Sequence, residues 1–313
     1  MRTVVIGSGS WGTALAQVLQ DNHQEVLVYG VAEAEVNDIN ENHKNSKYFG
    51  DVELNPELKA TTDIQCVKGA DIVLLAVPTI AIDPICHQIN DLLDKKTIII
   101  NVSKGFHPET NERMSEVIRR CIDEDKLSSV VSLIGPSHAE EVVIRLLTTI
   151  DAISLNNEDA VTVQNLFSNQ YLRIYTGNDE IGSELGVAIK NVMAIASGIL
   201  SGLGYQDNTR AALITRGLQE MIRYGVHFGG QQKTFMGLTG IGDLIVTCTS
   251  VHSRNFEAGY QIGKENSVEN FFKNVPQKSF IVLRKNMVLI CQFVKKFTKF
   301  YSMESFQVNV HKI

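Results

Sequence analysis

The chain has 313 residues, 44% of them hydrophobic and 20% charged, with a net charge of −6. This composition is typical of a globular protein of about two domains and excludes a disordered or fibrous chain. The negative charge argues against nucleic acid as a partner. The sequence begins with an apolar run at 3–6 and lacks the long apolar core and cleavage site of a secretion signal, so we expect a cytoplasmic protein.

The cysteines and the most apolar segment narrow the class further. The five cysteines are widely spaced and form no Cys-x-x-Cys pair, so we expect reduced thiols and no metal site. The segment 185–205 is long enough for a membrane helix, but it contains Lys190, Asn191, two serines and four glycines. We therefore expect no membrane span.

In chain order, the first half alternates short aliphatic runs with helical patterns, which predicts strands and crossover helices around a parallel sheet. The runs are almost continuously Val, Ile and Leu, as in strands buried on both faces. Long helical patterns replace them after about residue 177. We expect an α/β fold, with a Rossmann-like domain at 1–178 and an all-α domain at 179–313. The predicted strands are 3–6, 26–29, 71–77, 97–102, 130–134 and 149–154, and the predicted helices are 181–202, 208–228 and a run after 255.

A glycine-rich motif, Gly-Ser-Gly-Ser-Trp-Gly at 7–12, lies between the first predicted strand and a helical pattern. In a dinucleotide-binding turn, Gly7 permits the tight bend, Gly9 lets the backbone approach the pyrophosphate, and Gly12 lets the helix pack on the strand. The alternative is a glycine turn that binds nothing. The second strand ends at 29–31 without the acid or arginine that distinguishes NAD from NADP, and Glu33 lies slightly beyond, so the sequence leaves this choice open.

One charged residue interrupts the apolar segment at 185–205. Lys190 is its only charged side chain, and an unpaired charge in apolar surroundings costs several kcal/mol. Such a lysine therefore faces a polar cleft, where proton transfer can take place, or it lays its stem along the helix surface and extends its ammonium into water. The segment alone does not decide between these readings.

Six short motifs occur in order along the chain. They are Gly-Ser-Gly-Ser-Trp-Gly-Thr-Ala-Leu-Ala at 7–16, Ser-Lys-Gly at 103–105, Gly-Pro-Ser-His-Ala-Glu-Glu at 135–141, Ala-Ile-Lys-Asn-Val at 188–192, Gly-Ile-Gly-Asp-Leu at 240–244 and Ser-Arg-Asn at 253–255. Together they resemble the bacterial NAD(P)-dependent sn-glycerol-3-phosphate dehydrogenases over residues 1 to about 275. The resemblance implies an oxidoreductase that interconverts dihydroxyacetone phosphate and sn-glycerol 3-phosphate for phospholipid synthesis, with NADP or NAD as cofactor.

The resemblance also implies the catalytic residues. Lys190 matches the residue that gives a proton to the oxygen on C2 or takes it back while hydride moves to or from the nicotinamide. Asp243 matches a substrate-contacting carboxylate that positions this ammonium. Its alternative role is that of a helix cap before Leu244.

The binding residues follow from the same resemblance, with Arg254 and Asn255 matching those that hold the phosphate. Ordinary roles stay open for Lys104 as a surface lysine, for 253–255 as a helix start, and for Trp11 as packing between domains. The substrate set is Lys104, Gly135, Ser137, Lys190, Asp243, Ser253, Arg254 and Asn255, and the cofactor set is Gly7, Gly9, Ser10, Trp11, Gly12, Tyr48, Lys104, Ala139 and Arg254.

The segment 276–313 does not match the family. It holds seven Lys plus Arg and one acid, a net +6, whereas the rest of the chain carries −12. We expect that it reflects a change of reading frame in the gene or its record, and a charged, solvated helix at 289–301 is the alternative. If the segment is genuine, the helical domain lacks its usual closing helices and one cofactor contact.

Two other functions remain open from the sequence. One is a related two-domain hydroxy-acid dehydrogenase that shares the glycine motif and the helical lysine. The other is a cofactor-binding protein made non-catalytic by the altered tail. The expected partner is a small triose phosphate, and the sequence leaves a homodimer open.

Overall fold

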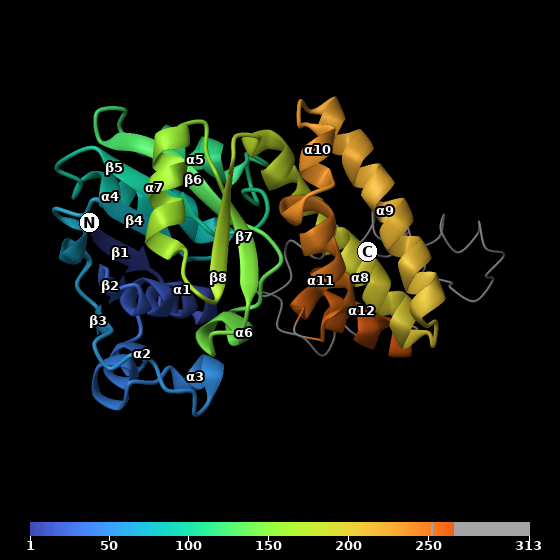
Figure 1. Cartoon of the computed structure of the whole chain (residues 1–313), viewed down its shortest axis with the longest axis horizontal. Coiled ribbons are helices and arrows are strands. Elements are labelled where there is room, and N and C mark those ends of the chain that lie inside the picture. Colours follow the sequence, from blue (N-terminus) through green and yellow to red (C-terminus); the bar gives the residue numbers. More distant parts are fainter. Residues whose placement is uncertain (252, 266–313) are drawn as a thin grey trace. The chain divides into compact units, whose positions relative to one another are not determined.

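The structure is a computed structural model, and it describes residues 1–251 and 253–265. Two compact units divide the chain, the first from Met1 to Glu184 and the second beginning at Leu185 (Figure 1). The domain boundary expected after residue 178 stays a prediction. The basic segment at 276–313, with its alternatives of a frame change and a charged helix, lies outside the described residues.

An eight-stranded sheet forms the centre of the first unit, in the order β3-β2-β1-β4-β5-β6-β7-β8 (Figure 1). Every neighbouring pair runs parallel except β6 and β7, which are antiparallel. The six predicted strands are all present, and the Rossmann-like class is confirmed. The strands are β1 (Arg2–Ile6), β2 (Glu25–Tyr29), β3 (Lys59–Thr61), β4 (Ile72–Leu75), β5 (Thr97–Asn101), β6 (Leu127–Ile134), β7 (Thr148–Ile153) and β8 (Leu172–Gly177).

Three strands differ from the prediction. The parallel direction is wrong for β7 against β6, because the segment between them holds only the five-residue α6 (Ala139–Val143) and no longer crossover helix returns the chain. The two edge strands were not predicted. β3 has three residues, and β8 alternates buried and exposed positions, so neither shows the continuous apolar run of the inner strands.

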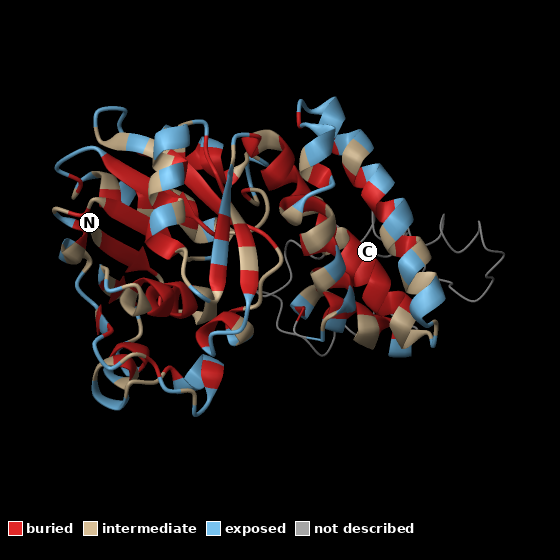
Figure 2. Cartoon of the chain, viewed as in Figure 1, coloured by how far each residue is buried: buried red, intermediate tan, exposed pale blue. Residues whose placement is uncertain are grey.

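Helices cover both faces of the sheet, because successive strand residues point to opposite sides. Val5 of β1 belongs to the core that includes α1 (Ser10–Asp21), α6 and α7 (Asn157–Phe167). Val4 and Ile6 belong to the core that includes α4 (Ile82–Asn90) and α5 (Met114–Cys121). Figure 2 shows the inner strands buried and the outer helix faces exposed. The remaining short helices are α2 (Glu33–Asn37), η1 (Asp38–Asn42), α3 (Ser46–Phe49), η2 (Ile64–Val67) and η3 (Thr79–Ala81).

The described part of the second unit is entirely helical. Its core joins α8 to three later helices through Met193, Leu218, Phe235 and Leu244. The predicted long helices at 181–202, 208–228 and after 255 are confirmed as α8, α9 and α12. The helices are α8 (Glu180–Gly202), which continues out of the first unit, α9 (Asp207–His227), α10 (Gln232–Phe235), η4 (Leu238–Gly242), α11 (Asp243–Thr249) and α12 (Arg254–Glu265).

Among the described residues, α8 is the one helix whose length and composition would allow it to cross a membrane. However, 67% of its most apolar window is buried inside the protein. A helix that is apolar on most sides is typical of the core of a globular domain as well as of a membrane span.

Glycines bring α8 and α12 into backbone contact. A Cβ atom on Gly198 of α8 would lie 2.0 Å from the carbonyl oxygen of Phe256, and one on Gly259 of α12 would lie 2.1 Å from that of Ile195. A larger side chain does not fit at these distances without a shift of the backbone, so the two helices are in direct backbone contact. This approach sets the start of α12 beside the middle of α8.

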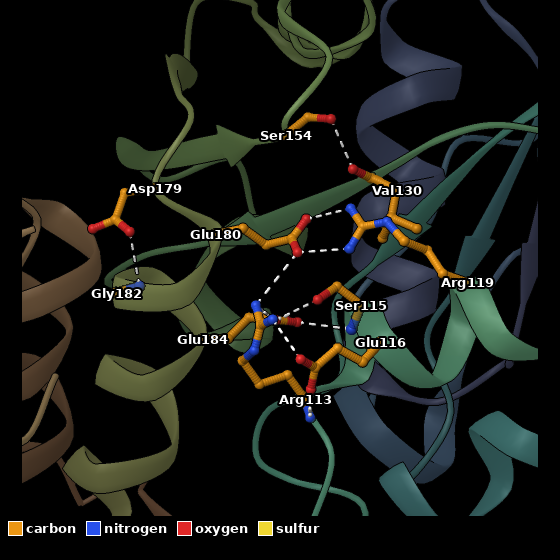
Figure 3. A network of polar contacts seen from close by, with 10 residues as sticks. All are labelled: Arg113, Ser115, Glu116, Arg119, Val130, Ser154, Asp179, Glu180, Gly182 and Glu184. Atoms are coloured by element: carbon orange, nitrogen blue, oxygen red, sulfur yellow. Dashed lines mark hydrogen bonds and ion pairs between the residues drawn. The ribbon is translucent and has the colours of Figure 1, made fainter. Parts of the chain in front are cut away.

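A buried ionic cluster fixes the first turn of α8 against α5 in the first unit (Figure 3). Arg119 donates two hydrogen bonds to Glu180, at 2.7 and 2.6 Å. Glu184, one turn further along, accepts hydrogen bonds from the amide and the hydroxyl of Ser115, at 3.0 and 2.6 Å. One nitrogen of Arg113 lies 3.4 Å from an oxygen of each carboxylate.

The pKa values of the two carboxylates in this cluster shift in opposite directions. Burial raises the pKa of Glu184 to about 7, although the Ser115 hydroxyl opposes this, and the nearby Glu180 charge adds to it. Burial also disfavours the charged form of Glu180, but the hydrogen bonds and charge of Arg119 outweigh it and lower its pKa. The cluster therefore favours the ionised form of Glu180 and the protonated form of Glu184.

Candidate active site

The glycine motif forms a tight turn between β1 and α1. Gly7 has a φ of +117°, and a Cβ atom there would lie 2.5 Å from the carbonyl oxygen of Ala76. A Cβ atom on Gly12 would lie 2.0 Å from the carbonyl oxygen of Gly7, so α1 packs directly on the turn. A Cβ atom on Gly9 would meet nothing within 4 Å, which leaves open space beside the first amides of α1. This space and these amides fit the pyrophosphate of a dinucleotide.

The segment that carries Tyr48 is tied to the glycine turn. Asn45 is fully buried and donates hydrogen bonds to the carbonyl oxygen of Ser8, at 2.8 Å, and to the hydroxyl of Thr13, at 2.9 Å. Tyr48 lies on the short α3 directly after Asn45 and is 38% exposed. Trp11, on the first turn of α1, is half-buried against the sheet core. The contacts of Asn45 therefore place the segment just before Tyr48 beside the glycine turn.

The predicted residues of later loops lie at the same edge of the sheet, since β1, β4, β5 and β6 are parallel. Lys104 follows β5, and its loop is held by a 2.5 Å hydrogen bond from the Ser103 hydroxyl to the carbonyl oxygen of Val77. Gly135 and Ser137 follow β6 and are joined by a 3.0 Å hydrogen bond from the Ser137 hydroxyl. Ala139, which follows them, begins α6, and α6 packs on α1. Ligands of such sheets bind at this edge.

Lys190 lies inside the second unit, and its side chain is 3% exposed. Its ammonium forms an ion pair with Asp243, whose side chain is 1% exposed, and donates a hydrogen bond to the hydroxyl of Thr247 at 3.2 Å. Thr247 in turn donates a 2.5 Å hydrogen bond to the backbone carbonyl of Asp243. The reading of Lys190 as a lysine that extends into water is therefore wrong. The charge is compensated internally, as a buried ammonium requires.

Asp243 does not act as the helix cap that the sequence left open. It is the first residue of α11, and the preceding Gly242 occupies the cap position without a side-chain hydrogen bond. Cys248, one residue after Thr247, is buried, and this burial raises the pKa of its thiol to about 12, although the Lys190 charge opposes the shift. A neutral thiol leaves Asp243 as the negative group that the structure shows beside Lys190.

The start of α12 contributes the Ser-Arg-Asn motif. The hydroxyl of Ser253 accepts a 3.2 Å hydrogen bond from the amide of Phe256, so the helix-start role is correct for this residue. The side-chain amide of Asn255 donates to that of Asn191 at 3.0 Å, which ties it to the residue next to Lys190. Arg254 is exposed and makes no ion pair with any described residue. Its guanidinium is thus available to an anion.

Comparison with known families assigns both units. Residues 2–160 match the family model of the NAD-dependent glycerol-3-phosphate dehydrogenase N-terminus, and residues 179–294 match that of its C-terminus. The chain belongs to the NAD-dependent glycerol-3-phosphate dehydrogenase family. The predicted resemblance is therefore confirmed, and the match of the C-terminal family model reaches residue 294.

Individual members of this dehydrogenase family agree. The chain is 49% identical to the glycerol-3-phosphate dehydrogenase [NAD(P)+] of Listeria innocua over 275 residues, which is 88% of this chain and 81% of the relative. The Macrococcus caseolyticus protein of the same name is 49% identical over 270 residues, 86% of this chain and 81% of its own. The crystal structure of glycerol-3-phosphate dehydrogenase from Coxiella burnetii has a TM-score of 0.82 and 32% identity, and the match covers 99% of this chain and 93% of that one.

Two neighbours of the dehydrogenase motifs were not predicted from the sequence. Thr247 contacts both members of the Lys190–Asp243 pair, and its spacing of four residues from Asp243 on one helix could have indicated it. Glu35 is the second, because its buried carboxylate accepts a hydrogen bond from Ser8 in the glycine turn. No sequence pattern marked it, since it lies six residues past the end of β2 at Tyr29.

Proposed function

We propose that this protein catalyses the reversible reduction of dihydroxyacetone phosphate to sn-glycerol 3-phosphate with NADH or NADPH, as an early step of phospholipid synthesis. The carrying observation is the buried Lys190–Asp243 ion pair in a chain that is about half identical to named dehydrogenases of this reaction. A cytoplasmic location and a homodimer belong to the same proposal. Cell fractionation tests the first, and light scattering of the purified protein tests the second.

The coenzyme would be held by residues of the first unit. Gly7, Gly9 and Gly12 leave room for the pyrophosphate, and the amides at the start of α1 would donate to it. The other cofactor residues in the proposal are Ser10, Trp11, Tyr48, Lys104, Ala139 and Arg254. When bound, the nicotinamide supplies a hydride to the substrate carbon or accepts one from it.

Lys190 would manage the proton that accompanies this hydride. In the direction of reduction, the ammonium donates its proton to the oxygen on C2 of the substrate as the carbonyl becomes an alcohol. In oxidation, the neutral amine takes that proton back. Asp243 stabilises the protonated form through the ion pair, and Thr247 fixes the position of the amine through its hydroxyl. Both contacts would limit the lysine to one geometry, which general acid–base catalysis needs.

The phosphate of the substrate would bind at the start of α12. The exposed guanidinium of Arg254 can donate two hydrogen bonds to one phosphate group, and Asn255 adds the side-chain N–H that it does not donate to Asn191. The backbone contact of α8 with α12 supports this part of the proposal, because it joins the helix that carries Lys190 to the helix that begins at Arg254. Lys104, Gly135, Ser137 and Ser253 complete the substrate set of the proposal.

A substrate panel tests the proposal. Purified protein is assayed by the absorbance of NADH and NADPH with dihydroxyacetone phosphate, and in parallel with unphosphorylated 2-keto acids. We expect turnover only with the triose phosphate. Turnover only with a keto acid would indicate a hydroxy-acid dehydrogenase, and coenzyme binding without any turnover would indicate a non-catalytic protein.

Arg254→Ala separates the phosphate role from the rest of the site. The variant should raise KM for dihydroxyacetone phosphate by at least about tenfold, because a charge-assisted contact is worth roughly 1.5–3 kcal/mol. Arg254→Lys keeps the charge but loses the planar pair of donors, so it should give a smaller rise. An unchanged KM in Arg254→Ala would exclude this residue from the phosphate site.

A further inference from the structure

The carboxylate of Glu35 contacts the glycine turn. It comes from the helix after β2 and not from the end of that strand, where such an acid is usually found. Glu35 of α2 has a side chain that is 10% exposed. Its Oε2 atom accepts a 2.5 Å hydrogen bond from the hydroxyl of Ser8, which stands between Gly7 and Gly9 and is 4% exposed. Its Oε1 atom pairs with the ammonium of Lys47 at 2.6 Å.

Ser8 also explains why the acid does not come from the strand end. A Cβ atom on Gly30, the residue directly after β2, would lie 2.5 Å from the Ser8 hydroxyl oxygen. A side chain at Gly30, where folds of this class often carry the acid that binds the adenosine ribose, would therefore force Ser8 to shift. The carboxylate of Glu35 reaches the same side of the glycine turn from the next helix. Its position is fixed, because both of its oxygens have partners.

The charges around this carboxylate favour a hydroxyl over a phosphate. A ribose 2′-hydroxyl can donate a hydrogen bond to a carboxylate, whereas a 2′-phosphate brings negative charge against it. The sequence from 29 to 34 contains no Arg or Lys that would bind such a phosphate. Lys47 is the cation nearest to Glu35 in the described structure, and the ion pair already engages it. Glu33, the neighbouring acid of α2, is exposed and adds further negative charge.

We propose that Glu35, oriented by Ser8, makes the coenzyme site select NAD(H) over NADP(H). The inference rests on the dinucleotide site of the proposed function, and it does not depend on the identity of the second substrate.

Calorimetric titration with two fragments tests this without any turnover. The probes are ADP-ribose and 2′-phospho-ADP-ribose, which differ only in the group that Glu35 would face. The wild-type protein should bind ADP-ribose at least about tenfold more tightly, an energy difference of about 1.4 kcal/mol. Glu35→Gln should reduce this ratio by about tenfold, chiefly through tighter binding of the phosphorylated fragment, since the amide removes the negative charge.

Matched variants keep the test decisive. Glu33→Gln removes an exposed charge from the same helix and should leave the ratio within about twofold of wild type, because solvent screens it. Ser8→Ala frees the carboxylate without removing its charge and should lower the affinity for ADP-ribose. A thermal melt of each variant shows whether it folds, and Ser8→Ala carries the test if Glu35→Gln does not.

Four results would overturn the inference: equal binding of the two fragments by wild type, no binding of either, an equal effect of Glu33→Gln and Glu35→Gln, or a selective loss of the phosphorylated fragment in Lys47→Met. The last would mean that Lys47 receives a 2′-phosphate. A clear preference for ADP-ribose in a protein that does not turn over dihydroxyacetone phosphate would uphold the inference while the proposed function failed.

Discussion

Glu184→Gln should make the protein more stable above neutral pH and leave it nearly unchanged in acid. Glu184 lies in the buried cluster of α5 and α8, where burial raises its pKa to about 7 from the ordinary 4.5 (Figure 3). A raised pKa in the folded state means that the folded protein binds a proton that the unfolded chain has lost. The stabilisation is complete below about pH 4.5 and disappears as the pH rises through about 7.

The magnitude follows from the two pKa values. One pKa unit corresponds to about 1.4 kcal/mol, so the rise from 4.5 to about 7 corresponds to about 3 kcal/mol. Glutamine resembles the protonated acid and does not titrate. The variant should therefore exceed wild type by up to about 3 kcal/mol at pH 8 and match it near pH 4.5. The hydrogen bonds from Ser115 favour the charged form, and the pKa of about 7 already includes their opposing effect.

Chemical denaturation of both proteins at several pH values measures this difference. Glu116→Gln is the control, because Glu116 pairs with the same Arg113 and its side chain is 44% exposed. A surface pair of this kind contributes about 1 kcal/mol or less, so this variant should follow wild type throughout. If Glu184→Gln were less stable than wild type at pH 8, the ionised carboxylate would stabilise the folded protein there, and the reasoning would be refuted.

Two further predictions concern the candidate active site. Asp243→Asn leaves the buried Lys190 ammonium without its carboxylate, so kcat should fall by roughly a hundredfold or more and stability by about 3–5 kcal/mol. Activity and unfolding assays check both, and an unchanged kcat would remove Asp243 from the mechanism. Gly12→Ala places a Cβ atom 2.0 Å from the carbonyl oxygen of Gly7, so α1 must shift and NADH binding by calorimetry should weaken by at least about tenfold. Gly50→Ala is the control. Its Cβ atom would contact no neighbour, so only the positive φ of this position disfavours it, and the variant should bind NADH normally.

Long, strongly patterned elements could be predicted from the sequence. The inner strands are continuous apolar runs because both of their faces are buried, and α8, α9 and α12 have the length that separates helices from strands. Edge strands lack this signal. β8 buries Leu172 and Ile174 but exposes Arg173 and Tyr175, and the direction of β7 depends on how the chain turns after β6.

In the candidate site, too, the features formed by neighbouring residues could be predicted, and the contacts between residues far apart in the sequence could not. The glycine turn is encoded in six successive residues, so its geometry could be read directly. The partner of Lys190 was named only by resemblance, because Asp243 is far along the chain and the contact depends on how α11 packs on α8. Glu35 was missed because its role follows from the space that Ser8 occupies over Gly30, which no pattern of residue types expresses.

The central claim is that Lys190 carries the proton of the reduction. The most direct measurement compares kcat for dihydroxyacetone phosphate reduction in Lys190→Met and Lys190→Arg with wild type, while calorimetry follows NADH binding in each. We predict that both variants bind NADH and that kcat falls by at least about a hundredfold in both, since methionine has no proton to give and arginine keeps its own. Turnover within a few-fold of wild type in Lys190→Met would contradict the account.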